Sequence, residues 1–237
     1  MPRSIRLADL PLVARRRRPL HARFLERPNR FTALVSLRGG ARALAHLPNP
    51  GRLTGVVSPG CPALLDGPFP APRTLSYTMV AARQSATWIG TNTTYANLVF
   101  PRLLAGGLFP EFDACTPRAE VRHGRSRFDF RVGETLVEVK SVTLVRGDRG
   151  LFPDAITARG ARHCHELRQV AERGAPTAIV FVAQRHDVES VEPEDGVDPA
   201  FGEALRAAAR AGVIVLACAL DLQPSGAREA RRIPVRL

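Results

Sequence analysis

The chain has 237 residues, of which 45% are hydrophobic, so it is long enough for one or two globular domains with their own cores. Its 34 lysine and arginine residues outnumber 22 acidic residues and give a formal net charge of +12. Such an excess favours a polyanionic partner, most simply nucleic acid, although a high-arginine codon bias could produce part of it.

Other composition signals exclude several classes of protein. No segment approaches the ~20 apolar residues of a membrane span, and the basic run Arg15 to Arg18 is not followed by the apolar core of a secretory signal. The four cysteines are widely scattered without a C-x-x-C pair, which argues against a disulfide framework or a zinc site. These features predict a cytoplasmic protein with reduced thiols.

The N-terminal part predicts a small β-domain. Residues 1–30 are basic and irregular, with no regular element expected. From Phe31 to Arg83, short apolar segments alternate with turns, and FTALVSL and ARALAHL flank the hairpin signal Arg38-Gly39-Gly40. Several short strands with little helix suit a barrel of the OB type, which often binds oligonucleotides. We therefore predict an OB-like domain over residues 1–83.

The remaining part, residues 84–237, predicts a mixed α/β domain. The expected order is a helix at 96–106, three strands between 118 and 144, a helix at 158–173, a buried strand at 177–184, a helix at 198–211 and a buried strand at 213–222. Helices that alternate with apolar, β-branched runs are typical of an α/β layer. The fold class is thus α/β, or α+β.

The segment Arg118 to Leu144 carries the strongest functional signal. Two-residue turns at Gly124-Arg125 and Gly133-Glu134 would set a register that places Glu120 opposite Asp129 and Asp129 opposite Glu138. Residues directly opposite one another share a face of the sheet, so three carboxylates would form one row, with Arg122, Arg127 and Lys140 beside it. Like charges in a row repel, and a divalent cation would remove that repulsion.

This arrangement indicates metal chemistry. Asp129 followed by Glu138-Val139-Lys140 matches the D…ExK pattern of metal-dependent nucleases. Asp129 and Glu138, with the backbone carbonyl of Val139, would hold Mg²⁺ or Mn²⁺, which prefer hard oxygen ligands. Lys140 would position water or stabilise developing charge, and Glu120 would be an auxiliary acid. The alternative is a solvated polar face on an ordinary meander.

Lysine usage supports the catalytic interpretation. Lys140 is the only lysine in the chain, which uses arginine for every other such cation. A compact ammonium and a planar guanidinium are not interchangeable. A single lysine beside the predicted carboxylate row therefore suggests a requirement for lysine at that position.

Five segments together resemble the sugar fermentation stimulation protein A family. They are HLPNPGRLTGVVSPG (46–60), IGTNTTYAN (89–97), EVRHGRSRFDF (120–130), VEVKSVTL (137–144) and LFPDAITARGARHCHEL (151–167). The resemblance runs over nearly the whole chain. It implies an N-terminal OB-like domain, a C-terminal domain similar to PD-(D/E)xK nucleases, and DNA binding.

The chain departs from the family pattern at three positions. Pro50 replaces a threonine and so loses a hydroxyl, and Ala158 replaces an acidic residue. Arg102 stands where family members tend to carry a glutamate in the helix before the sheet. Related nucleases often use such a helix acid as an extra metal ligand, so its loss argues against a second metal and against activity.

Two main functional hypotheses remain open. The first is a Mg²⁺- or Mn²⁺-dependent deoxyribonuclease, for which a homodimer would suit duplex cleavage. The second is a largely sequence-independent DNA-binding or regulatory protein with a vestigial nuclease site; an RNA-binding protein is a third. For each expected DNA contact the competing interpretation is structural: a solvated surface arginine, or a histidine that only packs. The expected DNA contacts are Arg30, Arg38, Arg52, Arg127, Arg159 and His163.

Overall fold

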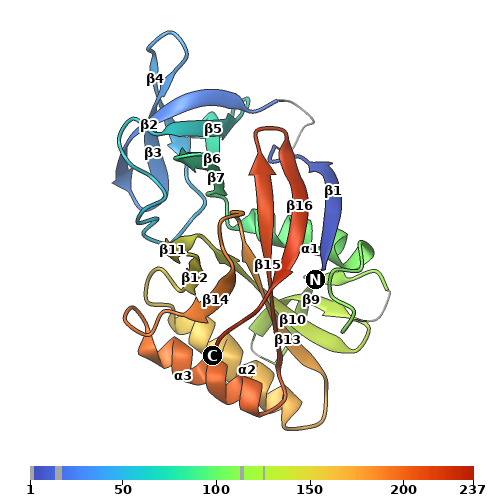
Figure 1. The fold of residues 1–237 in the computed structure, drawn as a ribbon. Coiled ribbons are helices and arrows are strands. Elements are labelled where there is room, and N and C mark those ends of the chain that lie inside the picture. The colour runs from blue at the N-terminus through green and yellow to red at the C-terminus, as the bar shows by residue number, and fades with distance from the viewer. Residues whose placement is uncertain (1–2, 14–17, 113–114, 125) are drawn as a thin grey trace.

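The chain forms a small β-barrel and a larger mixed β-sheet that is flanked by helices (Figure 1). The computed structural model describes residues 3–13, 18–112, 115–124 and 126–237. None of the helices in these residues is long and apolar enough to cross a membrane.

The barrel forms the N-terminal domain. Its strands are β2 (Leu20–Asn29), β3 (Thr32–Leu37), β4 (Arg42–His46), β5 (Pro62–Asp66) and β6 (Tyr77–Gln84), and β7 (Thr87–Gly90) extends the sheet. Pairing of β4 with β6 closes the barrel. Phe24, Val35, Leu65 and Met79 fill its core because inward residues alternate with polar ones along each strand. The OB-like prediction is confirmed.

The larger sheet has seven strands in the order β1-β16-β15-β13-β10-β9-β8. These are β1 (Ser4–Leu10), β8 (Arg118–His123), β9 (Ser126–Val132), β10 (Thr135–Val142), β13 (Thr177–Ala183), β15 (Ile214–Gln223) and β16 (Gly226–Ile233). β10, β13 and β15 run parallel. A separate three-stranded sheet contains β11 (Leu144–Arg146), β12 (Arg149–Phe152) and β14 (Ser190–Pro193).

Helices cover both faces of the large sheet. α1 (Thr94–Ala105) packs on one face, and α2 (Ala158–Ala171) and α3 (Pro199–Arg210) pack on the other. α3 illustrates the local cause: Asp198 caps it by accepting a hydrogen bond from the Phe201 amide, Pro199 suits its first turn, and its buried residues recur at helical spacing. Because both faces are covered, β13 is buried along its whole length.

The derived hairpin register is confirmed at both turns, but the strand ladders do not pair Asp129 with Glu120 or with Glu138. His123 pairs with Ser126, and Val132 pairs with Thr135, as the two-residue turns require. The alternative of a solvated polar face does not hold at Glu138. Glu138 is only 4% exposed because α2 packs over that side of the sheet.

Other elements differ from the sequence-based expectation. Residues 4–10 and 20–29 form β1 and β2, although no regular element was expected before residue 31. The division at residues 83 and 84 cuts β6, and β7 still pairs with β6 in the barrel sheet. β1 instead pairs with β16 in the large sheet. The first strand therefore lies in the C-terminal domain, and the barrel lies between β1 and the rest of that domain in sequence.

Candidate active site

Asp129 is held where two strands begin to separate. The ladder between β9 and β10 pairs residues only as far as Val137 with Phe130. Beyond that point the Val139 amide donates instead to Asp129 Oδ2, at 2.8 Å. The N–H and C=O of one strand residue point to the same edge, so the Val139 carbonyl also faces Asp129. The carboxylate and this carbonyl therefore lie together.

Asn97 supports Asp129 from the other side. It lies on α1, and its Nδ2 donates to Asp129 Oδ1 at 2.8 Å. The helix position that meets Asp129 thus carries an amide, and Arg102 lies farther along the same helix. Each Asp129 oxygen accepts one of these hydrogen bonds and keeps further lone-pair capacity.

Glu138 lies at the centre of a buried charge cluster. Lys140 Nζ lies 2.6 Å from Glu138 Oε1, and His163 Nδ1 of α2 lies 2.6 Å from the same oxygen without the alignment of a hydrogen bond. The Lys140 side chain is only 11% exposed. Glu138 Oε1 thus contacts the Lys140 ammonium and the His163 ring, whereas Oε2 has no hydrogen-bond partner among the described residues.

The two carboxylates have opposite electrostatic environments. Burial raises the pKa of Asp129, and the nearby negative charge of Glu138 raises it further, against the hydrogen bonds from Val139 and Asn97. Burial also acts to raise the pKa of Glu138, but the charge of Lys140 and the contact with His163 outweigh it, and the net pKa is lowered. Asp129 is therefore the carboxylate whose ionised form would gain most from a cation.

Glu120 does not join this pair. Its φ is +60°, an uncommon conformation for a non-glycine residue, and its side chain forms an ion pair with Arg127 at 2.8 Å. Among the described residues, no group of three histidine, cysteine, aspartate or glutamate side chains is arranged to hold a metal ion. The structure thus pairs Glu120 with Arg127 at an exposed position, and its role as an auxiliary acid stays a prediction.

The expected DNA contacts divide into exposed and buried residues. His163 is 1% exposed and packs against Phe128, so it does not face solvent or a phosphate backbone. Its contact with Glu138 explains its burial. The remaining candidates, which the structure leaves exposed, are Arg30, Arg38, Arg52, Arg127 and Arg159. Their role in DNA binding stays a prediction.

Gln184 is a residue that the sequence analysis missed. It follows β13 and is fully buried, and its Nε2 donates to Ser141 Oγ at 2.7 Å and to the Asn92 carbonyl at 2.8 Å. The backbone carbonyl of Gln184 accepts a hydrogen bond from the Gly90 amide of the barrel sheet. A glutamine at the end of an otherwise apolar strand was the available signal. Gln184 ties β10 to the junction between the domains.

Further polar contacts near the site hold the barrel and the C-terminal domain together. Asp154, in the loop after β12, accepts a hydrogen bond from the Leu53 amide of the barrel. Asn49 Nδ2 donates to the Thr91 carbonyl at 3.1 Å. Gly51 approaches Asp154 so closely that a Cβ there would lie 2.1 Å from its carboxylate oxygens. The loop of residues 48–51 (PNPG) therefore helps to hold the barrel against the C-terminal domain.

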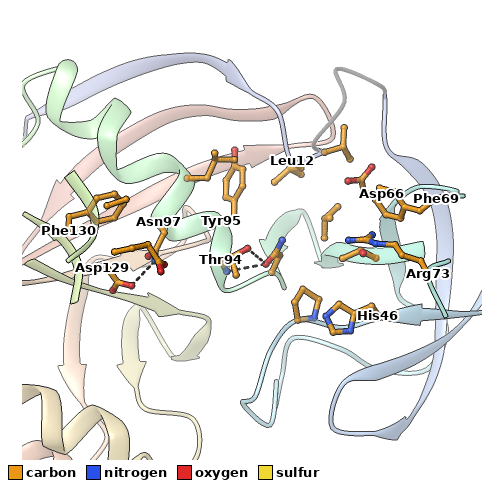
Figure 2. Close-up of a pocket in the computed structure, with 18 residues that line it drawn as sticks. Leu12, His46, Asp66, Phe69, Arg73, Thr94, Tyr95, Asn97, Asp129 and Phe130 are labelled. Atoms are coloured by element: carbon orange, nitrogen blue, oxygen red, sulfur yellow. Dashed lines mark hydrogen bonds between the residues drawn. The ribbon is translucent and has the colours of Figure 1, made fainter. Parts of the chain in front are cut away.

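A cavity of about 610 Å³ extends from Asp129 toward the barrel. Figure 2 shows Asp129, Asn97 and Phe130 at one end and His46, Phe69 and Arg73 at the other. Glu120 also lines this cavity. Asp129 thus borders a space to which both domains contribute.

Comparison with known proteins places the chain in a family. Residues 94–226 match the model described as "Sugar fermentation stimulation protein RE domain", and residues 25–91 match the "SfsA N-terminal OB domain". A sugar fermentation stimulation protein homolog from Moorella thermoacetica is 42% identical over 86% of this chain and 91% of its own length. The homolog from Symbiobacterium thermophilum is 38% identical over 92% and 95%.

A solved structure agrees with these matches. The structure of Pyrococcus furiosus SfsA in complex with Ca²⁺ has a TM-score of 0.84 to this chain, with 28% sequence identity over 92% of this chain and 96% of that one. Both domains are therefore matched in sequence, and the whole arrangement is matched in structure. The chain belongs to the sugar fermentation stimulation protein family.

Proposed function

We propose that this protein binds DNA and hydrolyses its phosphodiester bonds with the help of Mg²⁺ or Mn²⁺. The observation that carries the proposal is that a buried carboxylate, Glu138, and a half-buried one, Asp129, lie close to each other and to a lysine. Asp129 is fixed by Val139 and Asn97, and Glu138 presents an unpartnered Oε2. The net charge of +12 supports a nucleic-acid substrate.

The residues present fit a hard divalent cation. Asp129, Glu138 and the Val139 carbonyl supply oxygen ligands, and the orphaned Glu138 Oε2 is a buried polar atom that calls for a partner. The similar Pyrococcus furiosus protein was solved in complex with Ca²⁺, another oxygen-seeking dication. When bound, the cation would lower the pKa of a bound water and neutralise charge on the scissile phosphate.

The other side chains have distinct roles in this proposal. Asn97 orients Asp129, and His163 fixes the position of Glu138 through the contact at 2.6 Å. Lys140 neutralises Glu138 and places an ammonium group beside it for orienting water or stabilising developing charge. α2 and the sheet exclude bulk solvent from Glu138, which strengthens these electrostatic interactions.

One observation favours the alternative of a non-catalytic DNA-binding protein. Glu138 Oε1 already contacts the Lys140 ammonium and the His163 ring, each at 2.6 Å. α1 meets Asp129 through the amide of Asn97 and not through an acid. Because Lys140 already balances the charge of Glu138 and α1 supplies no further acid, the site attracts a cation less strongly. A weak attraction for cations is what we expect of a vestigial nuclease site.

A cleavage and binding comparison separates the two functions. The purified parent, Asp129→Ala and Lys140→Arg proteins are incubated with plasmid and single-stranded DNA in Mg²⁺, Mn²⁺ or EDTA, and DNA affinity is measured in parallel. Ca²⁺ binding by calorimetry gives a readout independent of cleavage. Glu134→Gln is the matched control, because that carboxylate is 82% exposed and paired only with Arg131 among the ion pairs of the described residues.

The nuclease proposal predicts metal-dependent nicking by the parent and by Glu134→Gln. Asp129→Ala should lose both cleavage and Ca²⁺ binding. Lys140→Arg should lose most cleavage and keep DNA affinity, because the charge is preserved while the shape of the cation changes. DNA binding without nicking in any metal would support the non-catalytic alternative, and equal nicking by Lys140→Arg would refute the role given to lysine.

A further inference from the structure

The cavity beside Asp129 has features that a phosphate-binding groove alone does not require. Its wall includes apolar residues from both domains, among them Val80, Phe130 and Leu98. Leu98 on α1 is 56% exposed, so its apolar side chain is accessible to a ligand in this cavity. This wall favours a ligand part that is flat or apolar, such as a nucleobase.

The far end of the cavity carries a planar platform. Phe69 and Arg73 lie in the loop between β5 and β6, and the Arg73 guanidinium carbon is 4.0 Å from the centroid of the Phe69 ring. Hydrogen bonding of the Phe69 amide to the Ser76 carbonyl at 2.7 Å holds the loop closed. A guanidinium stacked on an aromatic ring offers a flat, cationic surface on which a base can stack.

The size and the lining residues of the cavity limit the kinds of ligand that fit it. A volume of about 610 Å³ lies within the range of ~300–1,000 Å³ for small-ligand pockets. It suits one or two nucleotides and cannot enclose a double helix. Glu120 also lines it, and a base can donate its N–H groups to such a carboxylate.

We infer that this cavity receives unpaired bases of single-stranded DNA, which stack on the Phe69–Arg73 platform while the adjoining backbone passes Asp129. The inference rests on the proposed function for the role of Asp129. It adds a substrate class, single strands or single-stranded ends, and it assigns the barrel's β5–β6 loop to substrate selection. In Figure 2, the platform and Asp129 face the same space from opposite ends.

Binding in EDTA tests the inference without requiring cleavage. Fluorescence anisotropy measures the affinity of the full-length protein for labelled dT₂₀ and for a blunt 20-base-pair duplex at one salt concentration. The test variants are Phe69→Ala and Arg73→Lys. The matched controls are Phe31→Ala, an aromatic residue that is 46% exposed elsewhere on the barrel, and Arg42→Lys, an exposed arginine of β4; neither residue lines this cavity.

The parent should bind dT₂₀ more tightly than the duplex. Phe69→Ala should weaken dT₂₀ binding roughly 5- to 100-fold, the range expected for losing one stacked base, with little change for the duplex. Arg73→Lys should weaken dT₂₀ in the same direction because charge remains while planarity is lost. Both controls should bind as the parent does.

Specific results would overturn the inference. Unchanged dT₂₀ affinity in both test variants would do so, as would equal losses for dT₂₀ and duplex, or tighter binding of U₂₀ RNA than of dT₂₀. These outcomes are separable from failure of the nuclease proposal. A protein that nicks plasmid but shows no platform effect loses only this inference, whereas a selective platform effect without nicking loses only the nuclease proposal.

Discussion

Replacing Glu138 by glutamine should destabilise the protein severely. The side chain is 4% exposed, and its Oε1 lies 2.6 Å from both Lys140 Nζ and His163 Nδ1. The amide removes the charge that balances an ammonium only 11% exposed. Removing one partner of a buried ion pair costs about 3–5 kcal/mol. For a protein of this size we expect the Tm to fall by roughly 6–20 °C.

Calorimetric and urea unfolding of metal-free protein measure this loss. Glu134→Gln is the control, because it breaks an exposed pair that contributes at most about 1 kcal/mol. The double variant Glu138→Gln/Lys140→Met should recover at least half of the loss, since it leaves no unbalanced ammonium. A loss below about 1 kcal/mol for Glu138→Gln, or no recovery in the double variant, would refute the assignment of a mutually stabilising charge cluster.

The same cluster sets a pH dependence. The pKa of Glu138 is lowered from its ordinary value of 4.5 in the folded protein. Its ionised form therefore stabilises the fold fully above about pH 4.5, and this contribution is lost as the pH falls through the folded-state pKa. The difference in unfolding free energy between the parent and Glu138→Gln should shrink on acidification below pH 4.5. A constant difference would contradict the sign of the shift.

Three further predictions test other parts of the structure. The logarithm of the association constant for DNA should fall linearly with the logarithm of salt concentration, and the constant should depend little on sequence, as titrations between about 50 and 200 mM salt can show; binding confined to one sequence would contradict this. Gly51→Ala should cost about 1–3 kcal/mol through its clash with Asp154, and the loss measured by urea unfolding should be smaller in an Asp154→Ala background. In the native protein a thiol reagent should modify Cys115, which is exposed, much faster than Cys164, because Cys164 is buried and its pKa is raised to about 12; equal rates would contradict the described burial.

Much of the fold follows from local sequence signals. The two-residue turns beginning at Gly124 and Gly133 fix the register of β8, β9 and β10, which the structure reproduces. The uninterrupted apolar run of β13 is diagnostic of a strand covered on both faces. These features depend on neighbours within a few residues, so the sequence alone carries them.

The rest depends on contacts between distant residues. β2 was missed because only Ala22 and Phe24 of its first half face the core, between polar residues. The sequence leaves open whether His163 contacts phosphates or packs, because Glu138 lies 25 positions earlier in the chain and only the fold brings it to 2.6 Å. Asn97 has no motif that marks it as a partner of Asp129. Sequence reasoning thus identified the carboxylate pair but not the side chains that hold it.

The pairing of β1 with β16 has a consequence for how the molecule is synthesised. Ser4 lies opposite Arg231, so the large sheet cannot be completed until almost all of the 237 residues have left the ribosome. The barrel strands between Leu20 and Gly90, by contrast, pair only with one another. The barrel strands can therefore pair before the C-terminal strands are synthesised, whereas β1 stays without its partner strand until β16 is made. A fragment that starts at the barrel would leave β16 as an open sheet edge, so truncation would create an aggregation-prone protein and not a free nuclease-like domain.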